Sequence, residues 1–311
     1  MNLLIGAATI GLILALLGLG VFLSYRIYRI LDLTADGSFG VGAAIAAALL
    51  TRKVDPVLST AIGTIAGILA GGLTGILHTR FSVSALLAGV LTSTGLYSVS
   101  LFVMGSGNLS LVSTESVVSL AERLGQGLGL PPSLTLLGDP VSGGSLATLL
   151  LMTLLSAGLG FLLAAFMGTD LGLAMRAAAN PRMAKAMAID VDRMIVLGLG
   201  LSNGLIALSG ALFAQYSGFA NIQMGIGALV AGLANLMVGE ALLGRRPLGR
   251  WIAGAVVGAV VFRLLVAAAV RAGLNPDALK LVTALFVLAV LLLPQLGRRA
   301  RPQTLMEEVP R

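Results

Sequence analysis

Charged residues are scarce in this sequence, and cysteine is absent. Only 11% of the 311 residues are Asp, Glu, Lys or Arg, whereas 57% are hydrophobic and the mean hydropathy is +1.01. So few charges cannot cover the surface of a soluble protein of this length. The lack of cysteine excludes disulfides, thiol catalysis and thiolate metal sites, and a single histidine, His78, excludes a histidine-based metal cluster. The chain is therefore predicted to be a polytopic membrane protein.

The motifs of common enzymes are also missing. The sequence contains no HExxH motif, and its single histidine gives no sign of a Ser/His/Asp triad. None of the three lysines follows a glycine, so the phosphate-binding loop that ends in Gly-Lys-Ser/Thr is absent. Any ATP that this protein uses must therefore be hydrolysed by another chain. The net charge of +7 falls mostly in short loops between apolar runs, where basic residues orient a membrane protein, so nucleic-acid binding is not supported.

Long runs without charge are what the sequence has instead. Each reaches the roughly 20 residues that a helix needs to cross the hydrocarbon core. We predict an all-α fold with eight to ten transmembrane helices, forming a single transmembrane domain over residues 1–295, with a cytoplasmic tail at 296–311. The first run is predicted to be a retained span, because no basic segment and no small-residue cleavage site mark a signal peptide. The predicted spans are 3–24, 37–51, 57–77, 82–104, 145–167, 194–215, 223–243, 250–270 and 277–295.

The basic residues indicate how the chain is oriented. With nine spans and the C-terminal tail in the cytoplasm, the N-terminus lies outside. This arrangement puts fourteen of the 20 Lys and Arg residues on the cytoplasmic side and five outside, with Arg263 within a span. Basic loops favour the cytoplasmic side, so this orientation is preferred over its inverse. The segment 180–193 is then cytoplasmic.

Two stretches share a pattern of small residues. "FGVGAAIAAALL" from Phe39 and "MGIGALVAGLANL" from Met224 match with a constant offset of 185 residues. Small residues are common in membrane helices because they allow close packing, so the match alone is weak evidence. The predicted orientation runs the two stretches in opposite directions, as an inverted repeat over 30–168 and 194–295 requires, and such repeats are typical of transporters. The matched residues are Gly40, Gly42, Ala43 and Ala46, and Gly225, Gly227, Ala228 and Ala231.

Several polar residues fall at membrane depth. An ionised carboxylate at mid-bilayer costs about 2.5–3.5 kcal/mol, so a residue such as Asp36 must be shielded by protein or lie near water. Asp32 and Asp36 can also cap a helix that begins near Ser38, which is the role we favour for Asp36. Asn203 and Asn235 can form hydrogen bonds between helices. The candidates for a translocation pathway are Asp36, Ser38, Thr92, Ser93, Asn203 and Asn235.

The segment "NPRMAKAMAIDVDR", residues 180–193, places five charged side chains among alanines and methionines between two predicted spans. Asn180 as N-cap and Pro181 at the first helical position predict a short cytoplasmic helix. Small and flexible apolar residues on such a helix favour docking into a groove on a partner protein. The alternative is a helix that lies on the lipid headgroups. The apolar residues are Met183, Ala184, Ala186 and Met187.

The stretch Met175 to Leu212 resembles the coupling loop and following span of permease subunits of ABC importers of the branched-chain amino acid and ribose type, where "RA", then "NP..A...GI...R", then a glycine- and alanine-rich helix recur. "YRILDLTADGSFGVGAAIAA" is similar to the family's segment after the first span. "LLAGVLTSTGLYSVSLFVMGSGNLSL", 86–111, looks like a subgroup accompanied by lipoprotein-type binding proteins for aromatic or other amino acids. The resemblance covers about residues 10–295. Ala188 departs from it, because a glycine is usual before Ile189, and this puts the local turn in doubt.

The resemblance implies a permease subunit in the bacterial inner membrane, in contact with lipid and paired as a homodimer. An ATP-binding cassette ATPase would bind ATP and Mg²⁺ and grip the cytoplasmic helix, whereas this chain would bind no cofactor or metal. An extracytoplasmic binding protein would deliver the solute, expected to be an aromatic or branched-chain amino acid, to the outer segment 105–142. The coupling residues would be Asn180, Pro181, Arg182, Met183, Ala184, Lys185, Met187 and Ile189.

A secondary transporter driven by an ion gradient is the alternative, because inverted repeats and buried acids suit that class too. It requires an essential acid within the membrane, for which Asp36 is the candidate. A membrane scaffold without transport activity agrees with the glycine content but not with the cytoplasmic helix. The residues leave the substrate open, since a nucleoside, sugar or vitamin agrees with them as well as an amino acid does.

Overall fold

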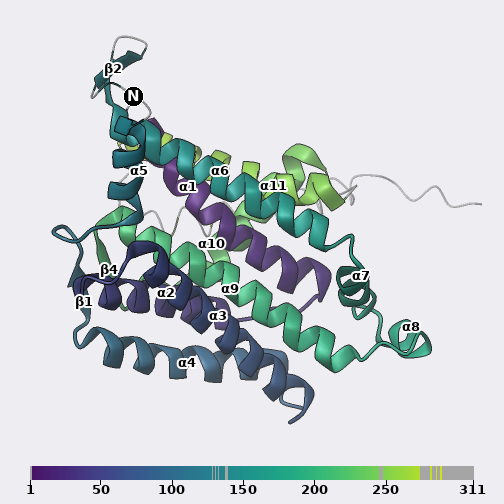
Figure 1. The fold of residues 1–311 in the computed structure, drawn as a ribbon. Helices are drawn as coiled ribbons and strands as arrows, with labels where there is room; N and C mark the ends of the chain where they lie inside the picture. The colour runs from purple at the N-terminus through teal and green to yellow at the C-terminus, as the bar shows by residue number, and fades with distance from the viewer. Residues whose placement is uncertain are drawn as a thin grey trace, which may run out of the picture.

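The computed structural model describes residues 2–127, 129, 131, 133–136, 139–244 and 248–273, and the single residues 281, 285 and 288. The described part is a bundle of long helices that run between the two ends of the molecule (Figure 1). Seven of these helices are long and apolar enough to cross a membrane, counting a π-helix at Phe22–Ile27 that continues α1, and α10 is apolar but shorter. The seven are α1 (Asn2–Val21), α2 (Thr34–Thr51), α3 (Pro56–Thr79), α4 (Ala85–Met104), α6 (Gly143–Phe166), α9 (Val191–Ser217) and α11 (Leu248–Arg271), and the shorter helix α10 spans Ala228–Leu243.

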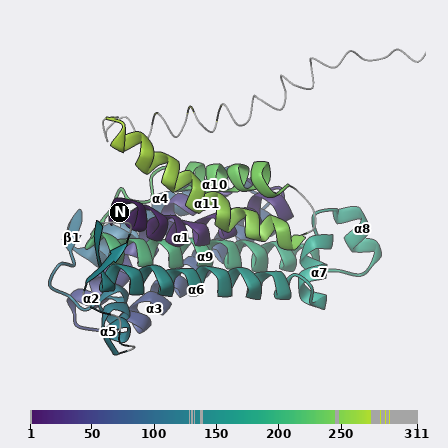
Figure 2. The ribbon, with the colours of Figure 1, turned by 90° about the horizontal axis from the view of Figure 1, so that it is seen from above.

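Short elements mark the two ends of the bundle. At one end, β1 (Asn108–Ser110) pairs antiparallel with β4 (Phe219–Asn221), and β2 (Ser133–Leu136) with β3 (Asp139–Ser142). The helix α5 (Val117–Gly127) lies at this end, as does the N-terminus, whereas α7 (Asp170–Ala177) and α8 (Pro181–Ala186) project from the opposite end (Figures 1 and 2). The N-terminus and α8 therefore lie on opposite sides, as the predicted orientation requires.

Helix α9 is the centre of the bundle and packs against α1, α2 and α3. A glycine stripe on α3 allows this close approach, because a Cβ on Gly67 or Gly71 would collide with the α9 backbone. Hydroxyl groups on the other side of α9 bond to α1, where Ser202 donates to the Gly20 carbonyl at 2.7 Å and Ser209 to the Ile13 carbonyl at 2.8 Å. The glycines of α3 and the hydroxyl groups of α9 thus hold α3 and α1 close to α9.

The apolar core lies along α1 and α9, while the outer helices expose their apolar side chains. Ile13 and Leu16 of α1 and Phe22 of the π-helix that continues it are fully buried. In contrast, Phe102 of α4 and Phe161 of α6 are 88% and 74% exposed. Exposed apolar faces of this size on long helices suit contact with lipid.

Most predicted spans are confirmed, and the all-α class is confirmed with two small two-stranded sheets that were not predicted. Four helix starts differ from the prediction by three residues or more, since α4 begins at Ala85 instead of 82 and α9 at Val191 instead of 194, and the other two concern α2 and α10. Helix α2 begins at Thr34 instead of 37, and α10 begins at Ala228 instead of 223, because residues 222–227 form turns that end at Gly227, whose φ is 86°. The predicted span 277–295 and the tail 296–311 lie outside the part of the chain described by the structure, apart from single positions.

Helices α2 and α10 meet at their N-terminal ends and run to opposite ends of the bundle. Asp36 in the first turn of α2 bonds to the start of α10, whereas Glu240 near the end of α10 pairs with Arg26 near the end that carries α8. The matched glycines of the two stretches have different roles, since Gly42 packs within α2 against Ala207 and Gly227 precedes α10. The inverted repeat itself stays a prediction.

Candidate functional site

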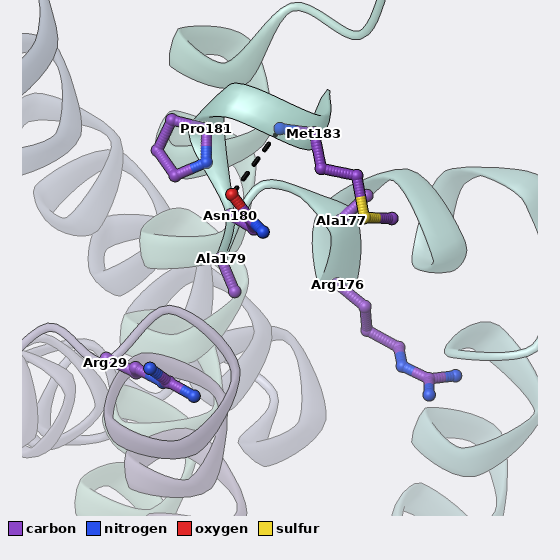
Figure 3. A pocket seen from close by; sticks show the side chains of 7 residues that line it. All are labelled: Arg29, Arg176, Ala177, Ala179, Asn180, Pro181 and Met183. Carbon is purple, nitrogen blue, oxygen red and sulfur yellow. Dashed lines mark hydrogen bonds between the residues drawn. The ribbon is translucent and has the colours of Figure 1, made fainter. Parts of the chain in front are cut away.

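The loop between α6 and α9 is built by a series of side-chain caps. The Thr169 hydroxyl accepts a hydrogen bond from the Gly172 amide at the start of α7, and the Asn180 side chain accepts one from the Met183 amide at 3.5 Å at the start of α8 (Figure 3). Pro181 is the first residue of α8, as its fixed φ and missing N–H favour. Asp190 then caps α9 through the Arg193 amide at 3.1 Å. The predicted short helix with Asn180 as its cap is confirmed.

Helix α8 has one side facing its own chain and one side facing outward. Ala184 is fully buried, and Ile189 is half-buried against the apolar core. Met183 and Met187, which are one helical turn apart, are 51% and 61% exposed. Ala184 was predicted to face a partner, and this is corrected: it holds α8 to the bundle and leaves the two methionines on the outer side.

A hollow of about 440 Å³ lies beside α8. Figure 3 shows that its two arginines come from different elements, with Arg29 from the segment before α2 and Arg176 from α7. Two guanidinium groups make its wall electropositive. The outer face of the loop therefore combines apolar methionines with cationic side chains. The hollow is lined by Arg29, Arg176, Ala177, Ala179, Asn180, Pro181 and Met183.

The turn that closes α8 contains a strained alanine. Ala188 has a φ of 56°, in the left-handed region that glycine adopts at little cost. The sequence raised doubt about the turn here because an alanine replaces the usual glycine, and the structure keeps the turn with alanine in the glycine conformation. An alanine in this region costs about 1–2 kcal/mol.

Replacing Ala188 with glycine is expected to stabilise the turn by about 1 kcal/mol, since the Cβ clash is removed. Hydrogen–deuterium exchange of the amides of Met187 and Ile189 measures this, and slower exchange is expected. The control is Ala186→Gly within α8, which removes a good helix former and should speed exchange by a similar free energy. Faster exchange in Ala188→Gly would contradict the strain.

A second cluster of polar side chains lies inside the bundle, between α2 and α9. Asp32 is 1% exposed; its Oδ1 accepts a hydrogen bond from the Thr34 amide at 2.9 Å, and its Oδ2 accepts one from the Asn203 side chain at 2.6 Å. Asn203 in turn accepts a hydrogen bond from the Ser38 hydroxyl at 2.7 Å. Asp32 has no ion-pair partner within the described ranges. The carboxyl group is thus held by hydrogen bonds alone.

Threonines extend this network to α3 and α4. The Thr34 and Thr74 hydroxyl oxygens lie 2.7 Å apart, and Thr74 donates to Thr92 at 2.9 Å. All three threonines are buried. Four helices, α2, α3, α4 and α9, therefore share one buried polar network of Asp32, Thr34, Ser38, Thr74, Thr92 and Asn203.

Asp36 has a different role from the one favoured on sequence. It does not precede a helix near Ser38, because α2 already begins at Thr34. Its carboxylate instead accepts hydrogen bonds from the Gly227 amide at 3.1 Å and the Leu229 amide at 2.9 Å, at the start of α10. Since it also lies in the first turn of α2, its charge faces the positive ends of two helix dipoles.

The six pathway candidates are thus placed in three groups. Ser38, Asn203 and Thr92 belong to the buried network, and Asp36 and Ser93 lie next to it along α2 and α4, where Ser93 contacts Gly37. Asn235 lies apart and donates to the Leu14 carbonyl of α1 at 3.1 Å. Asp32 and Thr74 were not among the residues predicted to line the pathway. For Asp32 the sequence did carry a signal, because an acidic residue within an apolar stretch indicates a functional or structural role.

Replacing Asp36 with leucine is expected to destabilise the junction of α2 and α10, because two amides lose their acceptor, at about 1–3 kcal/mol for each. Asp36→Asn retains one side-chain oxygen, which can accept from one of the two amides while its NH2 group faces the other, so it should lose about half as much stability as Asp36→Leu. Thermal unfolding of the purified protein in detergent compares the two variants. If Asp36→Asn were as destabilised as Asp36→Leu, the charge and not the hydrogen bonding would hold the junction.

Comparisons with known proteins agree with this architecture. A family model described as "Branched-chain amino acid transport system / permease component" matches residues 3–293. The chain is 34% identical over 289 residues to a tyrosine transport system permease protein of Clostridioides difficile (strain R20291), over 93% of this chain and 90% of the relative. It is 33% identical over 244 residues to an uncharacterized protein of Rickettsia prowazekii (strain Madrid E), over 77% of this chain and 78% of that protein.

The fold also has a counterpart among solved structures. With a TM-score of 0.50 and 16% identity, the chain is similar to an inward-facing structure assigned to the metal-chelate type of ABC transporter, over 94% of this chain and 85% of the other. This likeness concerns the fold alone. The family match over nearly the whole chain confirms the resemblance seen in the sequence. The chain therefore belongs to the family of branched-chain amino acid transport system permease components, and it is a multi-pass permease subunit of an ABC transporter in the inner membrane.

Proposed function

We propose that this permease imports an aromatic or branched-chain amino acid, driven by an ATPase subunit that docks on α8. The observation that carries the proposal is the outer side of α8, where Met183 and Met187 are half or more exposed on a helix fixed to the bundle by buried Ala184. A rigidly held helix with flexible apolar side chains suits docking in a groove of a second protein. The family assignment favours this class over a transporter driven by an ion gradient.

The ATPase partner would carry the nucleotide chemistry. This sequence has no Gly-Lys-Ser/Thr loop, so ATP and Mg²⁺ would be bound by the partner and no cofactor by this chain. The hollow beside α8, with Arg29 and Arg176 in its wall, offers positive charge next to the methionines. Movement of the ATPase pair would then be passed through α8 to α9, whose N-terminal cap, Asp190, follows the α8 turn directly.

The opposite end of the molecule would receive an extracytoplasmic binding protein. Helix α5 is anchored there, because the Val117 amide donates to the Gln215 side chain of α9 at 2.9 Å. Its outward residue Leu124 is 55% exposed, and Arg123 pairs with Glu115 at 2.5 Å. An anchored helix with exposed apolar and charged groups is a suitable docking surface.

The solute would pass near the place where α2 and α10 meet. N-terminal ends of interrupted helices carry partial positive charge and line the sites of many transporters. Here the Asp36 carboxylate already lies at the N-terminal ends of both α2 and α10. The amino acid would therefore find only a weak and transient site, with Ser38, Ser93 and Asn203 nearby. Two copies of the chain would form the complete pathway.

Substitution of Met183 and Met187 together by aspartate tests the ATPase docking. In proteoliposomes containing the permease, its ATPase and its binding protein, ATP-driven uptake of labelled tyrosine should fall at least tenfold, and the ATPase should no longer copurify. The control is the double leucine variant, which keeps the apolar surface and should retain both properties. Uptake that persists in the aspartate variant, or uptake driven by an ion gradient without ATP, would overturn the proposal.

The substrate is tested separately by competition. Unlabelled tyrosine, phenylalanine, leucine and ribose are added in excess to the wild-type assay. Competition by the amino acids and not by ribose supports the proposed class. If the wild-type assay showed no ATP-driven uptake of labelled tyrosine but took up labelled ribose, the proposed substrate would be wrong while the ATPase docking would stand.

A further inference from the structure

A second hollow, of about 410 Å³, lies at the end of the bundle that carries α7 and α8. Its lining residues are Tyr25, Arg26, Arg29 and Trp251. Tyr25 and Arg26 belong to the π-helix after α1, and Trp251 lies in the first turn of α11. Tyr28 ties this region to α9, because its hydroxyl donates to the Met194 carbonyl in the first turn of α9 at 2.7 Å. In the predicted orientation this end of the bundle faces the cytoplasm, so the hollow lies near the inner surface of the membrane.

Two buried N–H groups in the residues of this hollow have no hydrogen-bond partner. They are Nε of Arg26 and Nε1 of Trp251. A buried donor left unpaired is costly, and these two are the buried side-chain nitrogens without a partner within the described ranges. Their occurrence in one hollow points to a missing acceptor there.

The charges around the hollow indicate that this acceptor is an anion. Arg26 forms an ion pair with Glu240, which balances its charge. Arg29 is exposed and has no ion pair within the described part of the chain. Its backbone has a φ of 58°, an unfavourable conformation for arginine that directs the chain here between the π-helix and α2. One uncompensated guanidinium beside two free donors suits a phosphate group, whose oxygens accept several hydrogen bonds.

The aromatic residues favour a lipid phosphate over a free one. Trp251 packs edge-on against Phe22, with ring centroids 5.9 Å apart, and the Arg26 guanidinium lies 5.1 Å from the Tyr25 ring centroid. Tyrosine and tryptophan gather at the headgroup level of membranes, and arginines on the cytoplasmic side attract anionic lipids. Leu31, two residues beyond Arg29, exposes 48% of its surface and offers apolar contact to an acyl chain.

We propose that the hollow formed by Tyr25, Arg26, Arg29 and Trp251 binds the phosphate of an anionic phospholipid of the inner leaflet. Arg29 supplies the charge, and Arg26 and Trp251 supply N–H donors. Because Arg29 also lines the hollow beside α8, the bound lipid and the α8 surface share one side chain. This site is independent of which solute the protein transports.

Trp251 is the single tryptophan of the sequence, so its fluorescence reports on this site alone. The purified chain in a non-ionic detergent is titrated with dioctanoyl phosphatidylglycerol, with dioctanoylglycerol, which lacks the phosphate, and with inorganic phosphate. A saturable change in Trp251 emission is expected with phosphatidylglycerol and not with the other two. An equal response to inorganic phosphate would show that the hollow binds free anions, and the proposal that the phosphate belongs to a lipid would be wrong. Equal response to dioctanoylglycerol, or none to phosphatidylglycerol, would overturn the site.

Variants test the role of Arg29. Arg29→Gln should raise the apparent Kd for phosphatidylglycerol about tenfold, because one charge-assisted contact is lost. The matched control is Arg80→Gln, an exposed arginine after α3 that lies outside the hollow, and it should leave the Kd unchanged. Trp251→Phe keeps a ring against Phe22 and removes the N–H; phosphatidylglycerol should then raise its thermal midpoint by less than it raises that of the wild type. Unchanged affinity in Arg29→Gln would contradict the proposal.

Discussion

Replacing Gly71 with alanine is expected to destabilise the bundle strongly. Gly71 lies on α3, where a Cβ would collide with the Leu199 carbonyl oxygen and come 2.8 Å from the Asn203 Cβ of α9. Neither obstacle is the end of a flexible side chain, so the two helices must move apart. Overpacking of this kind costs about 1–3 kcal/mol and occasionally more. We expect the variant to melt several degrees below wild type.

Gly72 provides the matched control, because it is the next residue on the same helix and a Cβ there meets nothing within 4 Å. Gly72→Ala should be neutral or slightly stabilising, since alanine is the better helix former. Size-exclusion chromatography after heating in detergent measures both variants. Equal loss of folded protein in the two would show that α3 tolerates no methyl group at all, and the specific contact with α9 would be refuted.

Asn203→Leu is expected to have the second large effect, on both stability and transport. The Asn203 amide joins the Asp32 carboxyl group to the Ser38 hydroxyl, and both partners are buried. Leucine fills a similar space but leaves Oδ2 of Asp32 and the Ser38 hydroxyl without this partner, at about 1–3 kcal/mol for each. Because the network connects α2 to α9, we also expect slower ATP-driven uptake in the protein that still folds.

The control for Asn203 is Asn235→Leu. Asn235 is also buried, but among the described residues its side chain makes one hydrogen bond, to a backbone carbonyl, and removing it takes no partner from a carboxyl group. Its thermal midpoint should fall by less than half as much as that of Asn203→Leu. A larger fall for Asn235→Leu would mean that the buried network around Asp32 contributes little to stability.

The sequence determined the class of the protein and the positions of most helices. A hydrocarbon core requires long apolar helices, and this requirement is visible as charge-free runs. The start of α8 was also readable, because Asn180 and Pro181 act within one helical turn of their own position. Family membership followed from motifs along the chain and is confirmed by the family match.

The start of α2 and the start of α10 could not be read in this way. Asp36 lowered the apolar character of its stretch, so the predicted span began after it. In the folded chain its charge is satisfied by the amides of Gly227 and Leu229, which lie about 190 residues away in the sequence, so α2 extends past it. The turns of 222–227 shorten α10, although these residues are apolar enough to extend a span.

Helix capping and the partition of apolar runs into the membrane depend on residues that are neighbours in the sequence, so both can be predicted from the sequence directly. Contacts between distant segments decided the rest: which side of α8 is buried, which glycines touch α9, and that Asp32, Ser38, Thr92 and Asn203 share one network. A polar side chain in a membrane helix must find a partner, but its residue type does not say which helix supplies it. The packing of α2, α3, α4 and α9 around one another determines which helix supplies each partner.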